Sequence, residues 1–299
     1  MRKGIANTSH IAKLVGYTGI RPSPEGRYVS SGFTTIAITL LSFVSLVLPY
    51  SGFAQTGGNK LNVVVIDAGH GGKDPGTRGS YTKEKDIALK VSLKLGTLIE
   101  KNLEDVKVLY TRKNDVFITL DKRAKFANDN HADLFIVIHV NSLPEETPPA
   151  RKQSIMGTET YVLGLHKSEA NFEVAKRENS VILSEENYQD KYEGFDPNSP
   201  ESYILLTLNQ SANLESSLLL ASKIESQLKT KAGRKSKGVK QAGFLVLWQT
   251  TMPGVYCEIG YLSNTKEEKE LNDPKVQDNI ASAIYRALKE YKTQMESIN

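Results

Sequence analysis

The sequence predicts an α/β fold: a single domain built on a mixed, mostly parallel twisted sheet with helices on both faces. Two observations predict it. Several continuous apolar runs have the length of strands, and a strand that is buried on both faces has this pattern. Between these runs lie segments whose apolar residues recur at helical spacing, and such alternation of strands with helices is typical of α/β domains.

The apolar runs place the strands. We expect them at residues 62–67, 106–110, 134–139, 158–163, 244–248 and 254–259. Apolar residues at helical spacing predict helices at residues 84–101, 119–128 and 275–295. A glycine-rich loop, AGHGGKDPGTRGS, follows the first strand directly.

Residues 166–210 interrupt this alternation. The segment HKSEANFEVAKRENSVILSEEN has a charged, helical pattern, and DKYEGFDPNSPES after it has the composition of a loop. A long polar excursion inside a compact domain is usually a lid, a regulatory element or a partner site.

The first 54 residues have the pattern of a signal peptide. A long basic region precedes an apolar run at residues 35–49, which is short for a membrane span of about 20 residues. Ser51 and Ala54 are suitably small for cleavage before Gln55, which leaves residues 55–61 as a linker. An uncleaved anchor is the alternative. We expect an exported protein, periplasmic or associated with the cell wall, with no membrane anchor after cleavage.

Composition excludes several classes of protein. The net charge of +4 is too small and too dispersed for nucleic-acid binding. Cys257 is the only cysteine, so the chain has no internal disulfide and no lipoprotein cleavage site. We expect a monomer.

Two histidines are candidate metal ligands. His70 lies in the glycine-rich loop after the first strand, and His139 ends the apolar strand LFIVIH. Sites in open α/β sheets form at the carboxyl ends of strands, so the two imidazoles converge if these strands are neighbours. Zinc in hydrolases often takes two histidines and a carboxylate, which leaves a position for water. Asp67 is a candidate acceptor that would fix the tautomer of His70.

Two glutamates are candidates for the remaining roles. Glu84 begins the first helix and is a candidate third ligand, with Asp74 and Asp86 as competitors; it could equally complement the helix N-terminus without a metal. Glu258 lies inside the apolar strand GVYCEI, where a carboxylate is costly to bury unless it is paired, metal-linked or catalytic. It therefore fits a general base.

Four blocks of this sequence resemble the catalytic domain of the type 3 zinc-dependent N-acetylmuramoyl-L-alanine amidases. They are IDAGHGGKDPGT, KEKDIAL, LFIVIHVNS and CEIGYLSN, and YTRKNDVFITLDKRAKFAN matches the segment between them. The resemblance runs from about Asn62 to Tyr291. It implies a phosphorylase/hydrolase-like catalytic domain at residues 62–295, one Zn²⁺ held by His70, Glu84 and His139, a catalytic Glu258, and peptidoglycan as the substrate.

The insertion resembles that of family members which assist daughter-cell separation. In those proteins a helix covers the site until a protein activator displaces it. By this analogy Glu178, Glu185 or Glu186 would occupy the open zinc position at rest, with Glu178 favoured; an ordinary solvated helix is the alternative.

Other readings stay open at this point. Asn141 and Arg112 are candidates for supporting loops or contacting the stem peptide. Cys257 faces the opposite side of its strand from Glu258, so we expect it to pack in the core. A zinc peptidase is one rival, although the HExxH motif is absent, and a non-catalytic wall-binding or divisome scaffold is another.

Overall fold

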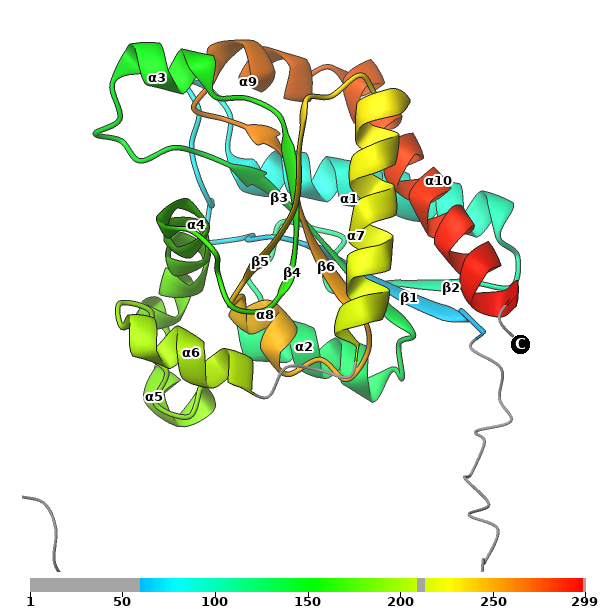
Figure 1. Cartoon of the computed structure of the whole chain (residues 1–299), viewed down its shortest axis with the longest axis horizontal. Coiled ribbons are helices and arrows are strands. Elements are labelled where there is room, and N and C mark those ends of the chain that lie inside the picture. The colour runs from blue at the N-terminus through cyan, green and yellow to red at the C-terminus, as the bar shows by residue number, and fades with distance from the viewer. Residues whose placement is uncertain (1–59, 209–212, 298–299) are drawn as a thin grey trace, which may run out of the picture. The chain divides into compact units, whose positions relative to one another are not determined.

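A six-stranded mixed sheet forms the centre of the computed structural model, which describes residues 60–208 and 213–297 (Figure 1). The strands are β1 Val63–Ala68, β2 Lys107–Tyr110, β3 Leu134–Asn141, β4 Thr158–Leu163, β5 Ser236–Ala242 and β6 Gly254–Tyr261. Their order is β2-β1-β3-β6-β4-β5. The pairs within β2-β1-β3-β6 are parallel, whereas β4 runs antiparallel to β6 and parallel to β5. The predicted mixed, mostly parallel sheet is confirmed.

Helices cover both faces of this sheet (Figure 1). They are α1 Glu84–Asn102, α2 Leu120–Asp129, α3 Pro149–Ser154, α4 Glu169–Asn179, α5 Tyr188–Lys191, α6 Pro200–Leu208, α7 Leu214–Thr230, α8 Leu245–Trp248, α9 Thr265–Leu271 and α10 Pro274–Ser297, with a 3₁₀ turn, η1, at Ser180–Ser184. The three long helices α1, α7 and α10 pack on one face, and α2, α8 and the insertion helices pack on the other.

The central strand β1 divides its side chains between two cores. Val64 and Ile66 point into the core formed with α1, α7 and α10, while Val65 between them points into the core on the opposite face. Because successive side chains of a strand alternate between faces, a strand covered on both faces is apolar at most of its positions. The continuous runs of the sequence follow from this double burial.

The insertion predicted at residues 166–210 contains α4, η1, α5 and α6. Ser168 caps α4 by accepting a hydrogen bond from the Asn171 backbone N–H. The helix α7 follows α6, and residues 209–212 between them lie outside the described part of the chain.

One strand prediction is wrong. The apolar run at residues 244–248 is a buried turn of helix, α8, and the strand lies just before it as β5. A short apolar run cannot by itself distinguish a strand from a buried helix. The edge strand β5 was missed because its sequence, SKGVKQA, is largely polar and half-buried.

The predicted signal peptide at residues 1–54 and most of the linker at 55–61 lie outside the described residues. Within residues 60–208 and 213–297, no helix combines the length and the apolar character that crossing a membrane requires.

Candidate metal centre

The loop after β1 holds His70 in a fixed conformation. His70 has a φ of 59°, in the left-handed region, which turns its ring toward the end of β3. Arg112 holds the backbone of this loop. Its guanidinium donates to the carbonyls of Ala68, Gly69 and Lys85 at 2.7–2.9 Å. Arg112 is thus a buried clamp on the backbone, as the loop-support alternative predicted.

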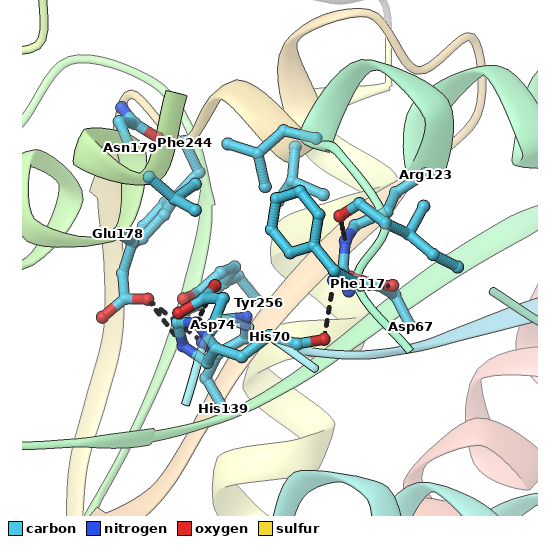
Figure 2. A pocket seen from close by; sticks show the side chains of 14 residues that line it. Asp67, His70, Asp74, Phe117, Arg123, His139, Glu178, Asn179, Phe244 and Tyr256 are labelled. Atoms are coloured by element: carbon cyan, nitrogen blue, oxygen red, sulfur yellow. Dashed lines mark hydrogen bonds and ion pairs between the residues drawn. The ribbon is translucent and has the colours of Figure 1, made fainter. Parts of the chain in front are cut away.

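Asp67 does not contact His70, contrary to the sequence prediction. Its Oδ1 accepts hydrogen bonds from Arg123, at 2.8 Å, and from Thr111. Asp74 takes the predicted place instead, with Oδ2 2.8 Å from His70 Nδ1 (Figure 2). The loop folds back through a bridge between Gly71 and Asp74, which brings the later aspartate to the ring.

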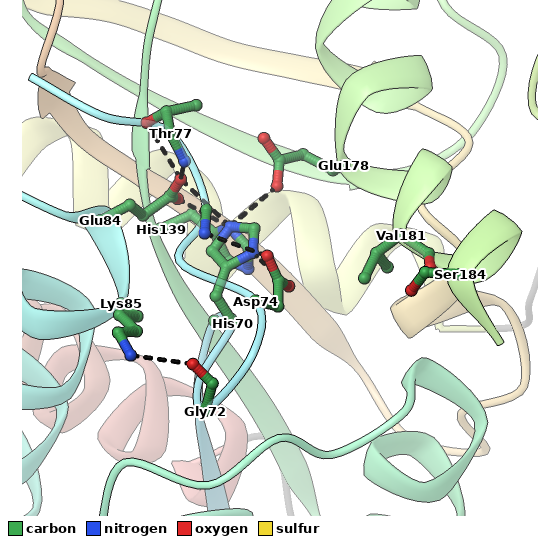
Figure 3. A network of polar contacts seen from close by, with 12 residues as sticks. His70, Gly72, Asp74, Thr77, Glu84, Lys85, His139, Glu178, Val181 and Ser184 are labelled. Atoms are coloured by element: carbon green, nitrogen blue, oxygen red, sulfur yellow. Dashed lines mark hydrogen bonds and ion pairs between the residues drawn. The ribbon is translucent and has the colours of Figure 1, made fainter.

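His139 and Glu84 lie beside His70. Because β1 and β3 are parallel neighbours, both histidines emerge at the same edge of the sheet. Glu84, at the start of α1, has Oε1 2.9 Å from His139 Nδ1 and Oε2 3.1 Å from His70 Nε2. Thr77 and the Val140 backbone N–H donate to the same carboxylate and hold it in place (Figure 3). The three residues singled out in the sequence meet in the structure.

Glycines make room for these rings. A Cβ added at Gly69 would lie 2.1 Å from His139 Nε2. One added at Gly76, whose φ is +65°, would lie 2.5 Å from His70 Cδ2 and 2.6 Å from Glu84 Oε2. The glycine-rich loop therefore admits the histidines because it lacks side chains at these two positions.

A fourth carboxylate reaches the site from the insertion. Glu178, in the last turn of α4, places Oε2 3.2 Å from both His70 Nε2 and His139 Nδ1. Of its two sequence competitors, Glu185 instead accepts hydrogen bonds from the Tyr192 hydroxyl, and Glu186 is exposed. The structure thus brings Glu178 to the histidines.

These four side chains fit a metal ion. One ligand atom of each, from His70, Glu84, His139 and Glu178, lies within 4.8 Å of all the others. Among the described residues, buried His70 Nε2 and Glu178 Oε2 have no hydrogen-bond partner, although they face each other. Two imidazoles with carboxylates are the donor set that zinc takes in hydrolytic sites.

The charges of the site are strongly coupled. Burial opposes ionisation of Glu84, but the charge of His70 beside it and the hydrogen bond with His139 hold its pKa below the usual range. Burial also opposes ionisation of Glu178, but the charge of Arg177 and the close contacts with both histidines hold its pKa well below the usual range. The site therefore holds two buried carboxylates, which need positive charge nearby.

Glu258 lies across from His139 in the register of β6 with β3. Its side chain is fully buried, and neither carboxylate oxygen has a hydrogen-bond partner in the part of the chain that the structure describes. Burial, together with the charges of Glu178 and Glu84, raises its pKa well above the usual range. Such a group is suited to proton transfer.

Sequence comparison identifies the family. The family model described as N-acetylmuramoyl-L-alanine amidase matches residues 64–290, which is most of the chain. The chain belongs to this family.

Two related sequences and one solved structure align with most of this chain. AmiA of Escherichia coli K12, an N-acetylmuramoyl-L-alanine amidase, is 31% identical over 241 residues, covering 79% of this chain and 78% of AmiA. AmiC of E. coli O6:H1 is 29% identical over 240 residues, which cover 79% of this chain and 54% of AmiC, so the match spans about half of that relative. The amidase of Clostridium difficile 630 matches with a TM-score of 0.57 and 25% identity, over 78% of this chain and 97% of that one.

Two features of the amidase site were missed in the sequence. Tyr256, two residues before Glu258, stacks on the His139 ring with centroids 4.3 Å apart. Arg177 donates from Nε to Glu178 Oε1 at 2.9 Å, and its Nη2 lies 3.8 Å from Glu258 Oε1. Tyr256 could have been found by strand periodicity, whereas nothing in the sequence places Arg177.

A cavity lined by both histidines and by a set of apolar side chains lies at the site (Figure 2). Its apolar lining is Phe117, Ile118, Leu120, Val181, Phe244 and Val246. Val181 belongs to the insertion, and the other five belong to the domain beneath it. The insertion therefore forms one wall of the cavity that leads to the site.

Proposed function

We propose that the chain is a peptidoglycan hydrolase that cleaves the amide bond between N-acetylmuramic acid and the L-alanine of the stem peptide. The observation that carries this proposal is the convergence of His70, Glu84 and His139 at one sheet edge, with Glu258 opposite His139. Membership of the amidase family supports the same reaction. Each chain would bind one Zn²⁺ through these three ligands.

Each residue of the site would have a separate role in hydrolysis. Zinc bound there would polarise the scissile carbonyl and lower the pKa of a water molecule to about 7. Glu258 would take the proton from that water during attack and pass it to the departing amine of L-alanine. Asp74 would hold the His70 ring through Nδ1, and Arg112 would keep the loop in place.

The insertion at about residues 166–210 would act as an inhibitory lid. Its Glu178 lies at both histidines, in the place that water and substrate need, which supports autoinhibition. A protein activator would displace it. Ile204 and Leu205 on α6 are 48% and 66% exposed, an apolar surface on the insertion itself that such a partner could bind.

The chain would act outside the cytoplasm. Peptidoglycan as substrate and the signal-peptide pattern of residues 1–54 support export to the periplasm or cell wall, with a role in cell separation. We expect the mature protein to begin near Gln55 and to be a monomer.

Muropeptide digestion tests the activity. The chain from Gln55 onward, and a version lacking residues 167–200, are incubated with peptidoglycan. An amidase releases peptides with a free L-alanine amino terminus and leaves muramic acid intact; other peptide products would indicate a zinc peptidase. Activity that rises on deletion supports the lid, and equal activity would make the insertion a docking surface.

Elemental analysis separates an enzyme from a scaffold. We expect one zinc per chain, lost in His70→Ala. A chain without bound zinc and without turnover, even after the deletion, would be a wall-binding scaffold.

A further inference from the structure

The guanidinium of Arg177 points into the site, although the side chain is 30% exposed. Nη1 donates to the Ser142 carbonyl at 2.9 Å, and Nη2 donates to Asn141 Oδ1 at 3.0 Å. Nη2 also lies 3.8 Å from Glu258 Oε1. Within the described residues, and apart from Glu178, its neighbour on α4, this guanidinium has polar partners in Asn141 at the end of β3, in Ser142 directly after it, and in Glu258 on β6.

The Asn141, Ser142 and Glu258 oxygens near this guanidinium are acceptors, and none of the three residues belongs to the insertion. If α4 moves away, the Ser142 carbonyl and Asn141 Oδ1 lose their Arg177 donors together. Glu258, whose oxygens have no hydrogen-bond partner within the described residues, loses its nearest cation. Arg177 therefore fills donor positions at these acceptors in the closed site, and an open site would leave the positions free for other N–H groups.

The Asn141 side chain is held so that its oxygen faces this place. The Ser142 backbone N–H donates to Oδ1 at 2.7 Å, and Nδ2 donates to Glu159 Oε2 at 3.4 Å. Glu159 is itself fixed by ion pairs with Lys237 and Lys240. The orientation of the Asn141 amide thus depends on groups outside the insertion and would persist when Arg177 leaves.

The location of these acceptors indicates which donors they serve. Glu258, as the acid that protonates the departing amine, must lie on the peptide side of the scissile bond. Asn141 and Ser142 follow His139 along β3, beside Glu258. Their acceptors therefore lie on the side of the leaving group, where the substrate carries backbone N–H groups.

We propose that Arg177 occupies the place of the substrate's own donors. In the open enzyme, Asn141 Oδ1 accepts the stem-peptide N–H that follows L-alanine, and the Ser142 carbonyl accepts a further N–H of the same peptide. Asn141 is then a substrate-positioning residue, and the lid blocks the peptide subsite as well as the metal. This inference rests on the proposed amidase function.

An ester analogue tests the contact directly. The substrate pair is muramoyl-L-alanyl-D-isoglutamine and its analogue in which an ester oxygen replaces the N–H after L-alanine. The full chain carrying Arg177→Met is used, because this change frees the acceptors. We expect kcat/KM for the ester to be roughly tenfold lower, mostly through KM, the size of one hydrogen bond.

The double variant R177M/N141A provides the decisive comparison. The two substrates should be hydrolysed equally well, because the acceptor is gone, whereas a merely structural role of Asn141 would lower both rates and preserve the discrimination. Discrimination that persists without Asn141, or that is absent in R177M, overturns the inference. Full chains carrying Glu178→Gln, with and without Asn141→Ala, repeat the comparison if R177M does not fold. A chain that cleaves neither substrate nor peptidoglycan in any background contradicts the proposed function instead.

Discussion

Glu178 Oε2 lies 3.2 Å from His70 Nε2, and within the described residues neither buried atom has a hydrogen-bond partner. The first belongs to the insertion and the second to the loop after β1. Two unpaired polar atoms that face each other at this distance are explained if both bind one cation. This relationship links metal binding to the position of the insertion, and the predictions below depend on that link.

Removal of the Glu178 carboxylate should activate the enzyme. In Glu178→Gln the lid loses a charged contact with both histidines, so we expect peptidoglycan hydrolysis without an activator to rise about tenfold or more, which corresponds to about 1.4 kcal/mol. Dye release from labelled peptidoglycan measures this. Glu186→Gln, an exposed position in the same insertion, is the matched control and should leave the rate unchanged. An unchanged rate in E178Q would contradict inhibition by this residue.

Metal removal should destabilise the fold. His70 and Glu84 lie against further buried charges. A cation that binds only the folded state stabilises that state, by about 4 kcal/mol when the free cation concentration is about a thousand times Kd. We expect chelation to lower the Tm of the wild-type chain and to have little effect on His70→Ala, which should hold no zinc. His131→Ala, at an exposed histidine, should keep both the zinc and the shift. Equal melting curves with and without chelator would contradict a bound metal.

Gly69→Ala should disrupt the site without touching a ligand. Its Cβ would lie 2.1 Å from His139 Nε2, so the ring or the loop must move. We expect a loss of zinc affinity of about tenfold or more, by analogy with the loss of groups that orient ligands. A zinc-competition titration measures it. Gly233→Ala, where nothing lies within 4 Å of the added Cβ, should retain the zinc even though its φ of +66° adds strain. Normal affinity in G69A would contradict the need for this glycine.

Much of the fold could be predicted because double burial leaves a clear trace. The strands β1, β3 and β6, which position His70, His139 and Glu258, are largely apolar on both faces, so their runs stand out in the sequence. The edge strand β5 has no such requirement and was missed. The segment α8, which follows β5, is as apolar as the buried strands. Only its three-dimensional packing decides that it is helical.

The site could be predicted only as far as strand ends determine it. His70 and His139 follow from parallel neighbouring strands, but the exchange of Asp67 for Asp74 depends on the left-handed turn at His70, which the sequence does not reveal. The choice of Glu178 over Glu185 depends on how α4 is anchored. The contacts that hold α4 in place, such as those of Asn179 with Gly243 and Leu245, join segments far apart in the chain.

Acid should weaken the fold through Glu159. Burial alone would raise the pKa of Glu159, but Lys240 and Lys237 lower it to about 2. A carboxyl whose pKa is lower in the folded state than its ordinary value of 4.5 stabilises the fold at pH values above 4.5. This contribution, about 3 kcal/mol, is lost as the pH falls from about 5 to 2. Urea unfolding at pH 7, 4 and 3 measures the loss. Glu159→Gln should have a weaker pH dependence than wild type, and exposed Glu173→Gln the same one. Parallel curves for wild type and E159Q would contradict this assignment.

Loosening the anchor of α4 should activate the enzyme while every ligand stays in place. Asn179, next to Glu178, donates from Nδ2 to the Gly243 carbonyl at 2.7 Å and accepts at Oδ1 from the Leu245 N–H at 3.0 Å. These buried contacts join the insertion to the start of α8 and the residue shortly before it, and each is worth about 1 kcal/mol. In Asn179→Ala the closed position loses both, so the open population should rise and peptidoglycan hydrolysis with it, by roughly five- to thirtyfold. Zinc content should remain one per chain, which distinguishes this effect from damage to the site. The exposed Asn198→Ala is the control within the insertion. If N179A keeps its zinc and its low basal rate, the position of α4 does not limit access to the site, and Glu178 would then act only as a local ligand.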